Sequence, residues 1–269
     1  ILVDYRRRLR STWKRFTWCH FFFFTDANPW QLEKPRQRTN GWVKRVLVNS
    51  IRPAQHFFFM SSIPRSGSTL LGAILNQNPS LFVTPTSPLL DILNRVEQAW
   101  PGIVQTGSWQ DPVQKVNVSR GVIRSIYEHI PRPFVIDKHR GWIKNISTLQ
   151  MILGYPPKII YPVRDLSEVV ASFMSLVLKA RKKGQANFVD SQLQARGLEP
   201  NLTNSTEIIL GNVKEHYDSL QVALKQNRDC IHLVEYADLM QAPERVIDGV
   251  YQFLGLAPYF HEFDRIQPL

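Results

Sequence analysis

"FFFMSSIPRSGSTLLGAILNQNP" (57–79) decides the fold because it joins a strand pattern, a turn pattern and a helix pattern in that order. Three Phe and Met60 are typical of a buried strand, and Pro64 with the small residues after it indicates a turn. Apolar residues then repeat at helical spacing, at Leu70, Leu71, Ile74 and Leu75. This order brings free backbone N–H groups and the positive end of a helix to one point. The stretch therefore predicts a binding site for a phosphate or sulfate.

Strand and helix patterns alternate along the rest of the chain. Short apolar runs typical of buried parallel strands are "PFVIDK" (133–138), "PKIIYPV" (157–163) and "DCIHLVEY" (229–236). Helical patterns cover 166–183, 205–227 and the segment from Pro243 to Gly255. The alternation predicts an α/β fold, a P-loop-type parallel sheet with helices on both faces. Ligands of such sheets bind beyond the carboxyl ends of the strands.

The basic charge of the chain is concentrated at its start. The formal net charge is +11 over 269 residues. Residues 1–56 hold 12 Lys and Arg against 3 Asp and Glu, which leaves 33 − 12 = 21 against 22 − 3 = 19 for residues 57–269. The folded part is therefore nearly balanced, and its composition indicates no nucleic-acid partner.

Residues 1–56 are interpreted as a basic, aromatic N-terminal extension to a domain at 57–269. The longest apolar run of the extension, around Phe21–Phe24, is far shorter than the roughly 20 residues of a membrane-spanning helix. No cleavage site follows it, so we expect no secretory signal and a cytoplasmic protein. A poorly ordered extension and a peripheral contact with an anionic membrane both fit this composition.

Cationic side chains follow three of the predicted strands. Arg65 lies in the first turn, Lys138 comes after Asp137 at the end of the second run, and Arg164 ends the third. Because the carboxyl ends of parallel strands share one edge, we expect these cations to lie close together. The turn lacks the first Gly and the Lys of the Walker pattern, and Asp137 is its one obvious partner for a metal ion.

Two segments resemble the sulfotransferases that use 3′-phosphoadenosine 5′-phosphosulfate. "PRSGSTLL" (64–71) is similar to their 5′-phosphosulfate loop, with a closer likeness to the tyrosylprotein and bacterial branches than to the cytosolic branch. "YPVRDLSEVVASF" (161–173) resembles their 3′-phosphate segment, with Arg164 and Ser172 at the matching positions. The resemblance spans about residues 57–265 and implies transfer of a sulfuryl group to an acceptor hydroxyl or amine.

The resemblance also implies roles for individual residues. Arg65 and Lys138 would be catalytic, acting on the leaving phosphate and on the transferring group. The nucleotide would be held by Arg65, Ser66, Gly67, Ser68, Thr69, Arg164, Ser172 and Tyr236. The donor would be 3′-phosphoadenosine 5′-phosphosulfate, without a metal ion. The acceptor would carry a hydroxyl group, on a saccharide, a peptide tyrosine, a lipid or a small molecule.

The chain departs from the family pattern in two places. Pro85 and Thr86 stand where the tyrosylprotein branch has an acidic pair, so Asp91 and His139 are the candidates for the general base. The chain ends at "HEFDRIQPL", before the segment that usually closes over the nucleotide, so we expect a truncated C-terminus.

Two other functions fit the same residues. In a kinase-like phosphotransferase, Asp137 would hold magnesium and Arg65 would replace the missing Lys. A catalytically impaired binding module would keep the anion site without turnover.

Overall fold

A parallel sheet of five short strands forms the centre of the computed structural model, which describes residues 55–102 and 112–267. The extension predicted at 1–56 lies almost entirely outside the described residues. The strands pair in the order β2-β3-β1-β4-β5 and every pair is parallel. Their bounds are β1 (His56–Met60), β2 (Leu81–Val83), β3 (Phe134–Lys138), β4 (Ile159–Val163) and β5 (Ile231–Glu235). The predicted α/β class with a parallel sheet is thereby confirmed.

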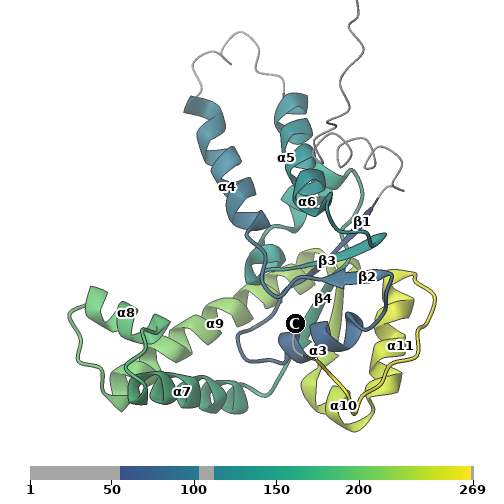
Figure 1. The fold of residues 1–269 in the computed structure, drawn as a ribbon. Coiled ribbons are helices and arrows are strands. Elements are labelled where there is room, and N and C mark those ends of the chain that lie inside the picture. Colours follow the sequence, from purple (N-terminus) through teal and green to yellow (C-terminus); the bar gives the residue numbers. More distant parts are fainter. Residues whose placement is uncertain (1–54, 103–111, 268–269) are drawn as a thin grey trace, which may run out of the picture. The chain divides into compact units, whose positions relative to one another are not determined.

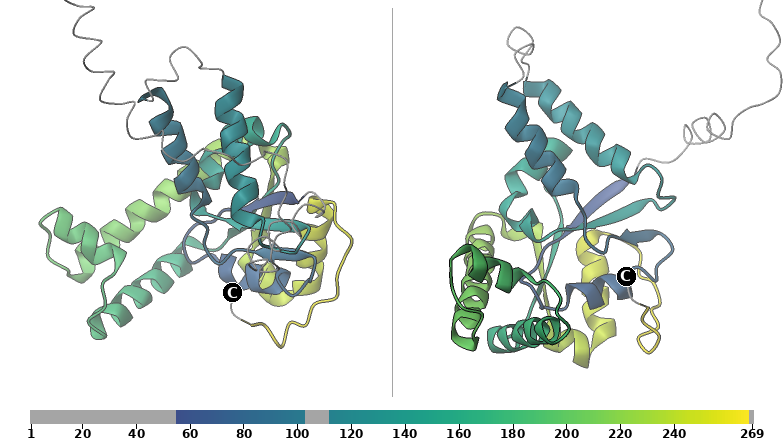
Figure 2. Two further views of the ribbon diagram at one scale, coloured as in Figure 1. Left: turned by 45° about the horizontal axis from the view of Figure 1, so that its top comes forward. Right: turned by 60° about the vertical axis from the view of Figure 1, so that its left-hand side comes forward.

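Helices cover both faces of the sheet, as Figures 1 and 2 show. One face carries α3 (Ser68–Leu75), α10 (Tyr236–Gln241) and α11 (Pro243–Leu254). The other face carries α4 (Leu89–Ala99), α5 (Pro112–Tyr127), α6 (Ile146–Leu153), α7 (Leu166–Lys182) and α9 (Leu202–Gln226), with α8 (Phe188–Ala195) packed on α9. Three short 3₁₀ segments complete the fold, η2 (Trp100–Gly102), η4 (Arg140–Lys144) and η5 (Arg228–Cys230).

Strand β1 separates two hydrophobic cores. Phe57 and Phe59 pack with the apolar side chains under α4 to α9, whereas Phe58 and Met60 pack with those under α3 and α11. Successive side chains of a strand point to opposite faces, so an uninterrupted apolar run suits a strand that is covered on both sides. This explains why the run at 57–60 has no polar alternation.

The chain changes direction across the sheet at β1. After β1 it builds β2 and β3 on one side, and β4 and β5 then lie on the other side. A sheet of this kind has a crevice outside the carboxyl end of the strand where the order reverses. Residues that follow β1, β3 and β4 therefore face a common crevice.

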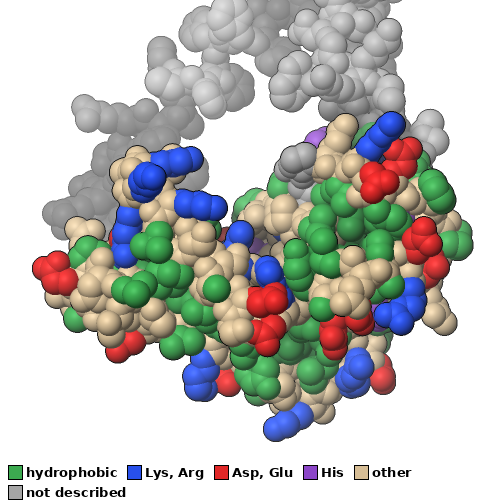
Figure 3. Space-filling view, turned by 90° about the horizontal axis from the view of Figure 1, so that it is seen from below, with side chains coloured by type: hydrophobic (Ala, Val, Ile, Leu, Met, Phe, Trp, Pro, Cys, Tyr) green, Lys and Arg blue, Asp and Glu red, His purple; other side chains and the backbone are tan. Residues whose placement is uncertain are grey.

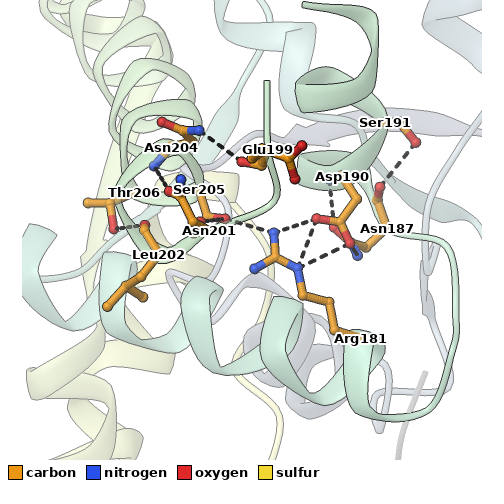
Figure 4. A network of polar contacts seen from close by, with 10 residues as sticks. All are labelled: Arg181, Asn187, Asp190, Ser191, Glu199, Asn201, Leu202, Asn204, Ser205 and Thr206. Carbon is orange, nitrogen blue, oxygen red and sulfur yellow. Dashed lines mark hydrogen bonds and ion pairs between the residues drawn. The ribbon is translucent and has the colours of Figure 1, made fainter. Parts of the chain in front are cut away.

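Arg181 joins the three helices that project from the sheet, as the close-up in Figure 4 shows. Its Nε donates to Asp190 Oδ1 of α8 at 2.9 Å and its Nη2 donates to Ser205 Oγ of α9 at 2.7 Å. Asn187 caps the first turn of α8 by accepting from the backbone N–H of Asp190 at 3.0 Å. These contacts fix the direction of α7, which carries Ser172. Over 55–102 and 112–267, no helix is long and apolar enough to cross a membrane.

Candidate active site

The turn after β1 is held in a tight conformation by its own serines. Ser66 donates from both its backbone N–H and its hydroxyl to the carbonyl oxygen of Ile63, at 3.3 and 2.8 Å. Arg65 has a φ of 68°, which is rare for a residue with a side chain. Backbone strain of this kind clusters at functional sites, where it directs a side chain. Here the strain fixes the direction in which Arg65 leaves the turn.

Gly67 ends the turn at a position that only glycine fits well. Its φ is 94°, and a Cβ atom placed there would lie 2.5 Å from Cδ2 of Tyr236. Gly67 is also the N-cap of α3, and no side chain caps that helix. The first backbone N–H groups of α3 thus keep the positive end of the helix dipole available to an anion.

Three cations meet beside this turn. Arg65 Nε donates to Ser172 Oγ of α7 at 3.2 Å, and Lys138 Nζ donates to Thr69 Oγ1 of α3 at 3.4 Å. Partial burial and the neighbouring Arg140 lower the pKa of the Lys138 ammonium. Partial burial and the neighbouring Arg65 lower the pKa of the Arg140 guanidinium. Arg140 is therefore within electrostatic range of both Lys138 and Arg65.

The three cations lack acidic partners. Across residues 55–102 and 112–267, none of the ion pairs involves Arg65, Lys138 or Arg140. In Figure 3 the face seen from below is hollowed near its middle, and Lys and Arg side chains border the hollow. Neighbouring like charges repel each other unless an anion lies between them. The arrangement is suited to a ligand that carries more than one negative charge.

Arg164 occupies the opposite side of the turn from Lys138. Its Nε donates to Glu168 Oε2 at 2.7 Å, and its guanidinium carbon lies 4.4 Å from the ring centroid of Tyr236. Tyr236 begins α10 and touches Gly67, so the ring connects Arg164 to the turn. A planar guanidinium stacked on an aromatic ring is held in a defined orientation.

Arg164 and Ser172 were predicted as a pair. Arg164 follows β4 just before α7 begins and Ser172 lies within α7, and each side chain has a different partner. Ser172 accepts from Arg65, whereas Arg164 contacts Glu168 and Tyr236. The structure thus links the turn after β1 directly to α7. Sequence spacing could not reveal this contact, because Arg65 and Ser172 are 107 residues apart.

The interpretation of Asp137 as a metal partner at the rim was wrong. Its side chain is fully buried and accepts hydrogen bonds from Trp142 Nε1, at 2.7 Å, and from the hydroxyl of Tyr127. Asp137 and Lys138 are adjacent in a strand, so their side chains point to opposite faces. Lys138 reaches α3, whereas Asp137 points into the core beneath α5 and η4. It is a structural residue, and the kinase-like alternative loses its magnesium ligand.

Asp137 is expected to make folding pH-dependent. Burial raises the pKa of this carboxyl above its ordinary value of 3.8. The protonated form is therefore favoured by folding, and its stabilising effect is lost as pH rises from about 4 through the raised pKa, with a limiting slope of about 1.4 kcal/mol per pH unit. Asp137→Asn cannot titrate, so its free energy of unfolding should lack this fall in urea titrations across pH.

An exposed carboxylate gives the control for that experiment. Asp264→Asn should retain the full pH dependence of the unchanged chain, because Asp264 is solvated. Parallel stability curves for the unchanged chain and Asp137→Asn would contradict the role given to Asp137.

The two candidates for the general base lie side by side. His139 Nε2 is 3.8 Å from Asp91 Oδ2, and His139 Nδ1 accepts from the backbone N–H of Gly141 at 3.1 Å. Asp91 lies in the first turn of α4 with a side chain that is 72% exposed, against 22% for His139. Pro85 and Thr86, which replace the acidic pair, are exposed in the preceding loop.

Arg140 is the member of the site that the sequence patterns did not assign. It follows Lys138 by two residues and starts η4, and its carbonyl oxygen accepts from Ser61 Oγ at 2.5 Å. The sequence signal that could have identified Arg140 was its position two residues after Lys138, at the end of a strand. The signal was weak, because a lone Arg outside a strand is usually an ordinary surface charge.

Comparisons with known proteins identify the family of the chain. A model of the sulfotransferase family matches residues 58–262. Among curated proteins, none matches the chain. The solved sulfotransferase STF9 from Mycobacterium avium has a TM-score of 0.51 at 12% identity, over 81% of this chain and 68% of its own. This likeness concerns the fold.

Two further solved structures are similar to the chain. The sulfotransferase domain from the curacin biosynthetic pathway has a TM-score of 0.49 and 22% identity, over 77% of this chain and 76% of its own. The sulfotransferase domain of the Synechococcus PCC 7002 olefin synthase has a TM-score of 0.48 and 21% identity, over 77% and 75%.

Proposed function

The chain belongs to the sulfotransferase family and is an enzyme of sulfuryl transfer, and from this premise we propose which of its residues bind the donor and the acceptor. The co-substrate of the family is 3′-phosphoadenosine 5′-phosphosulfate, which carries anionic groups at both ends of its ribose. The observation that carries the assignment is that Arg65 and Lys138 lie beside the uncapped N-terminus of α3, with Lys138 Nζ 3.4 Å from Thr69 Oγ1, and that within the described part of the chain neither side chain is used by an ion pair.

The 5′ end of the donor is assigned to the turn and α3. The first backbone N–H groups of α3, at Ser68 and Thr69, are uncapped, and the Thr69 hydroxyl lies 3.4 Å from Lys138 Nζ, while Ser66 shapes the turn through its bonds to Ile63. When bound, the donor supplies an activated sulfuryl group on a phosphate. Arg65 and Lys138 stabilise the negative charge that grows on the leaving phosphate oxygen. These fixed cations supply the charge that a metal ion would otherwise provide, so we propose transfer without a metal.

The 3′-phosphate is assigned to Arg164 and Ser172. Arg164 directly follows β4, Ser172 lies in the second turn of α7, and the Tyr236 ring contacts both Arg164 and the turn at Gly67. A guanidinium and a hydroxyl can bond two oxygens of one phosphate, and charge-assisted hydrogen bonds of this type are strong. The pair would distinguish this donor from nucleotides without a 3′-phosphate.

The donor site is tested by calorimetric titration with 3′-phosphoadenosine 5′-phosphate and, separately, with adenosine 5′-phosphate, both in a chelator. These ligands differ only in the 3′-phosphate. We expect micromolar binding of the first and binding at least about tenfold weaker of the second. Equal affinity for the two ligands, or binding that requires magnesium, would contradict the assignment.

Glu168 is expected to compete with the 3′-phosphate for Arg164. The two side chains form an i,i+4 ion pair at 2.7 Å, with Glu168 56% exposed. Such pairs contribute only about 0.3–0.5 kcal/mol, and the carboxylate also repels the incoming phosphate. Glu168→Gln should therefore tighten binding of 3′-phosphoadenosine 5′-phosphate by about 3-fold at low salt.

Calorimetry at low and high salt checks this prediction. Glu262→Gln is the control, because Glu262 is an exposed glutamate that pairs with Arg265, three residues on, at 4.0 Å. Weaker binding by Glu168→Gln would mean that the ion pair holds Arg164 ready for the phosphate.

The family implies an acceptor that carries a hydroxyl group. We propose that it approaches from the side of the crevice where α4 meets η4. There His139, which follows Lys138 in the chain, lies beside Asp91 of α4, whereas Lys138 itself reaches Thr69 of α3.

A further inference from the structure

A general base must accept the proton of the acceptor hydroxyl. The two candidates, Asp91 and His139, differ in whether they have a free lone pair for that proton. His139 Nδ1 accepts the backbone N–H of Gly141 at 3.1 Å, so this nitrogen carries no hydrogen. Neutral imidazole has one protonated nitrogen, which must then be Nε2. Nε2 has no lone pair left for a proton, and it faces the carboxylate of Asp91 at 3.8 Å. Only Asp91 keeps free lone pairs.

We propose that Asp91 is the general base for the acceptor hydroxyl and that His139 positions it. This inference rests on the proposed function. The acceptor oxygen forms a bond to sulfur, the bond from sulfur to the 5′-phosphate oxygen breaks, and its electron pair leaves with the phosphate. The acceptor proton moves to a carboxylate oxygen of Asp91. Atoms and charge balance without another reactant.

The backbone at His139 puts Asp91 on the correct side for this step. His139 has extended dihedral angles, φ −150° and ψ 134°, so its side chain points away from that of Lys138. Lys138 reaches Thr69 of α3, beside the leaving phosphate, whereas His139 reaches Asp91 of α4. In an in-line displacement the acceptor enters opposite the leaving oxygen. The base is therefore expected on the side that Asp91 occupies.

The first turn of α4 is packed firmly against the segment that carries His139. The backbone N–H of Ser87 donates to the carbonyl oxygen of Lys138 at 3.0 Å, and Ser87 Oγ accepts from the N–H of Leu89 at 3.0 Å. A Cβ on Gly141 would lie 2.5 Å from Cδ2 of Leu90, so α4 touches the backbone of η4 directly. Asp91 is held at this contact, yet its side chain is open to an incoming acceptor.

The distance of 3.8 Å between His139 Nε2 and Asp91 Oδ2 is longer than a hydrogen bond. Catalytic hydrogen bonds are often long before the substrate binds and shorten in the complex. The imidazole Nε2–H faces the Asp91 carboxylate and would orient it once the pair closes to hydrogen-bonding distance. His139 in turn stays fixed by Gly141 and by an edge contact with Trp142 at 6.2 Å between ring centroids. This is the relation expected between a base and a positioning residue.

The test compares Asp91→Asn with Glu97→Gln, a second exposed carboxylate on the same helix. Single-turnover release of 3′-phosphoadenosine 5′-phosphate from the donor is followed with water and with phenol as acceptors. We expect Asp91→Asn to lower the rate by about 100-fold with its affinity for 3′-phosphoadenosine 5′-phosphate unchanged, because general bases contribute at least about this factor. Glu97→Gln should behave as the unchanged chain.

A second variant separates positioning from structural support. His139→Gln should lower the rate by about 10-fold, and the double variant should equal Asp91→Asn alone, because His139 acts only through Asp91. Formate added to Asp91→Gly should restore part of the rate. Unfolding temperatures of all variants are compared with that of the unchanged chain.

The outcomes distinguish this inference from the proposed function. Full turnover in Asp91→Asn would overturn the role of Asp91, and additive losses in the double variant would overturn the role of His139. No turnover in the unchanged chain, or no binding of 3′-phosphoadenosine 5′-phosphate, would overturn the proposed function instead.

Discussion

Lys138→Ala is expected to lower the rate of sulfuryl transfer by up to about 1000-fold, since removing one preorganised donor to a developing oxyanion costs about 10² to 10³ in rate. The ammonium lies 3.4 Å from Thr69 Oγ1, at the point where α3 presents its free N–H groups. Partial burial and Arg140 lower its pKa, so the charge is poorly solvated before the reaction. The interaction of the Lys138 ammonium with the donor is therefore strongest in the transition state, when negative charge develops on the leaving oxygen.

The affinity for the product 3′-phosphoadenosine 5′-phosphate distinguishes stabilisation of the transition state by Lys138 from binding of the ground state. If Lys138 acts mainly in the transition state, the affinity for 3′-phosphoadenosine 5′-phosphate should fall by no more than about 5-fold. The backbone of Lys138 stays in β3, paired with Met60, so the sheet should persist. Single-turnover rates and calorimetry on the same preparation measure the two quantities.

Lys115→Ala is the matched control for Lys138→Ala. Lys115 is a half-buried lysine of α5 that pairs with Glu97 at 2.7 Å. Its removal should leave both rate and affinity unchanged. Equal losses of rate and affinity in Lys138→Ala would show that Lys138 binds the ground state as tightly as the transition state.

The double variant Arg164→Ala with Ser172→Ala is expected to weaken binding of 3′-phosphoadenosine 5′-phosphate by about 500-fold. A hydrogen bond to a charged group contributes about 1.5–3 kcal/mol and a neutral one about 1 kcal/mol. The loss of both bonds to the 3′-phosphate accounts for a change of this size. Adenosine 5′-phosphate lacks the group that these residues are proposed to hold. Its affinity should change by less than about 3-fold.

Calorimetry with the two nucleotides measures the difference, and Arg245→Ala is the control. Arg245 is an exposed arginine on α11 that lies 3.7 Å from Asp238. Equal weakening of both nucleotides by the double variant would place Arg164 and Ser172 at the 5′ end instead. Ser172 already accepts from Arg65, so this result would be physically reasonable.

The sequence by itself determined the framework of the site. The apolar run at 57–60, the turn at 61–67 and the helical spacing after Ser68 are local patterns, and each is set by residues close together in the chain. The strands at 134–138 and 159–163 could be identified for the same reason. Parallel strands then bring their carboxyl ends to one edge, so Arg65, Lys138 and Arg164 were expected at a common crevice.

Only the tertiary structure decided which way the side chains at these strand ends point and what they touch. Asp137 and Lys138 are neighbours in sequence, yet one is buried under Trp142 and the other reaches α3. The contacts between Arg65 and Ser172, and between Asp91 and His139, join separate elements. Side-chain direction depends on the exact residue at which a strand ends and on the helices packed beside it. A sequence pattern gives neither the exact end of a strand nor the packing of its neighbouring helices. The approach of the cations at the strand ends could therefore be predicted, whereas the residues that their side chains contact could not.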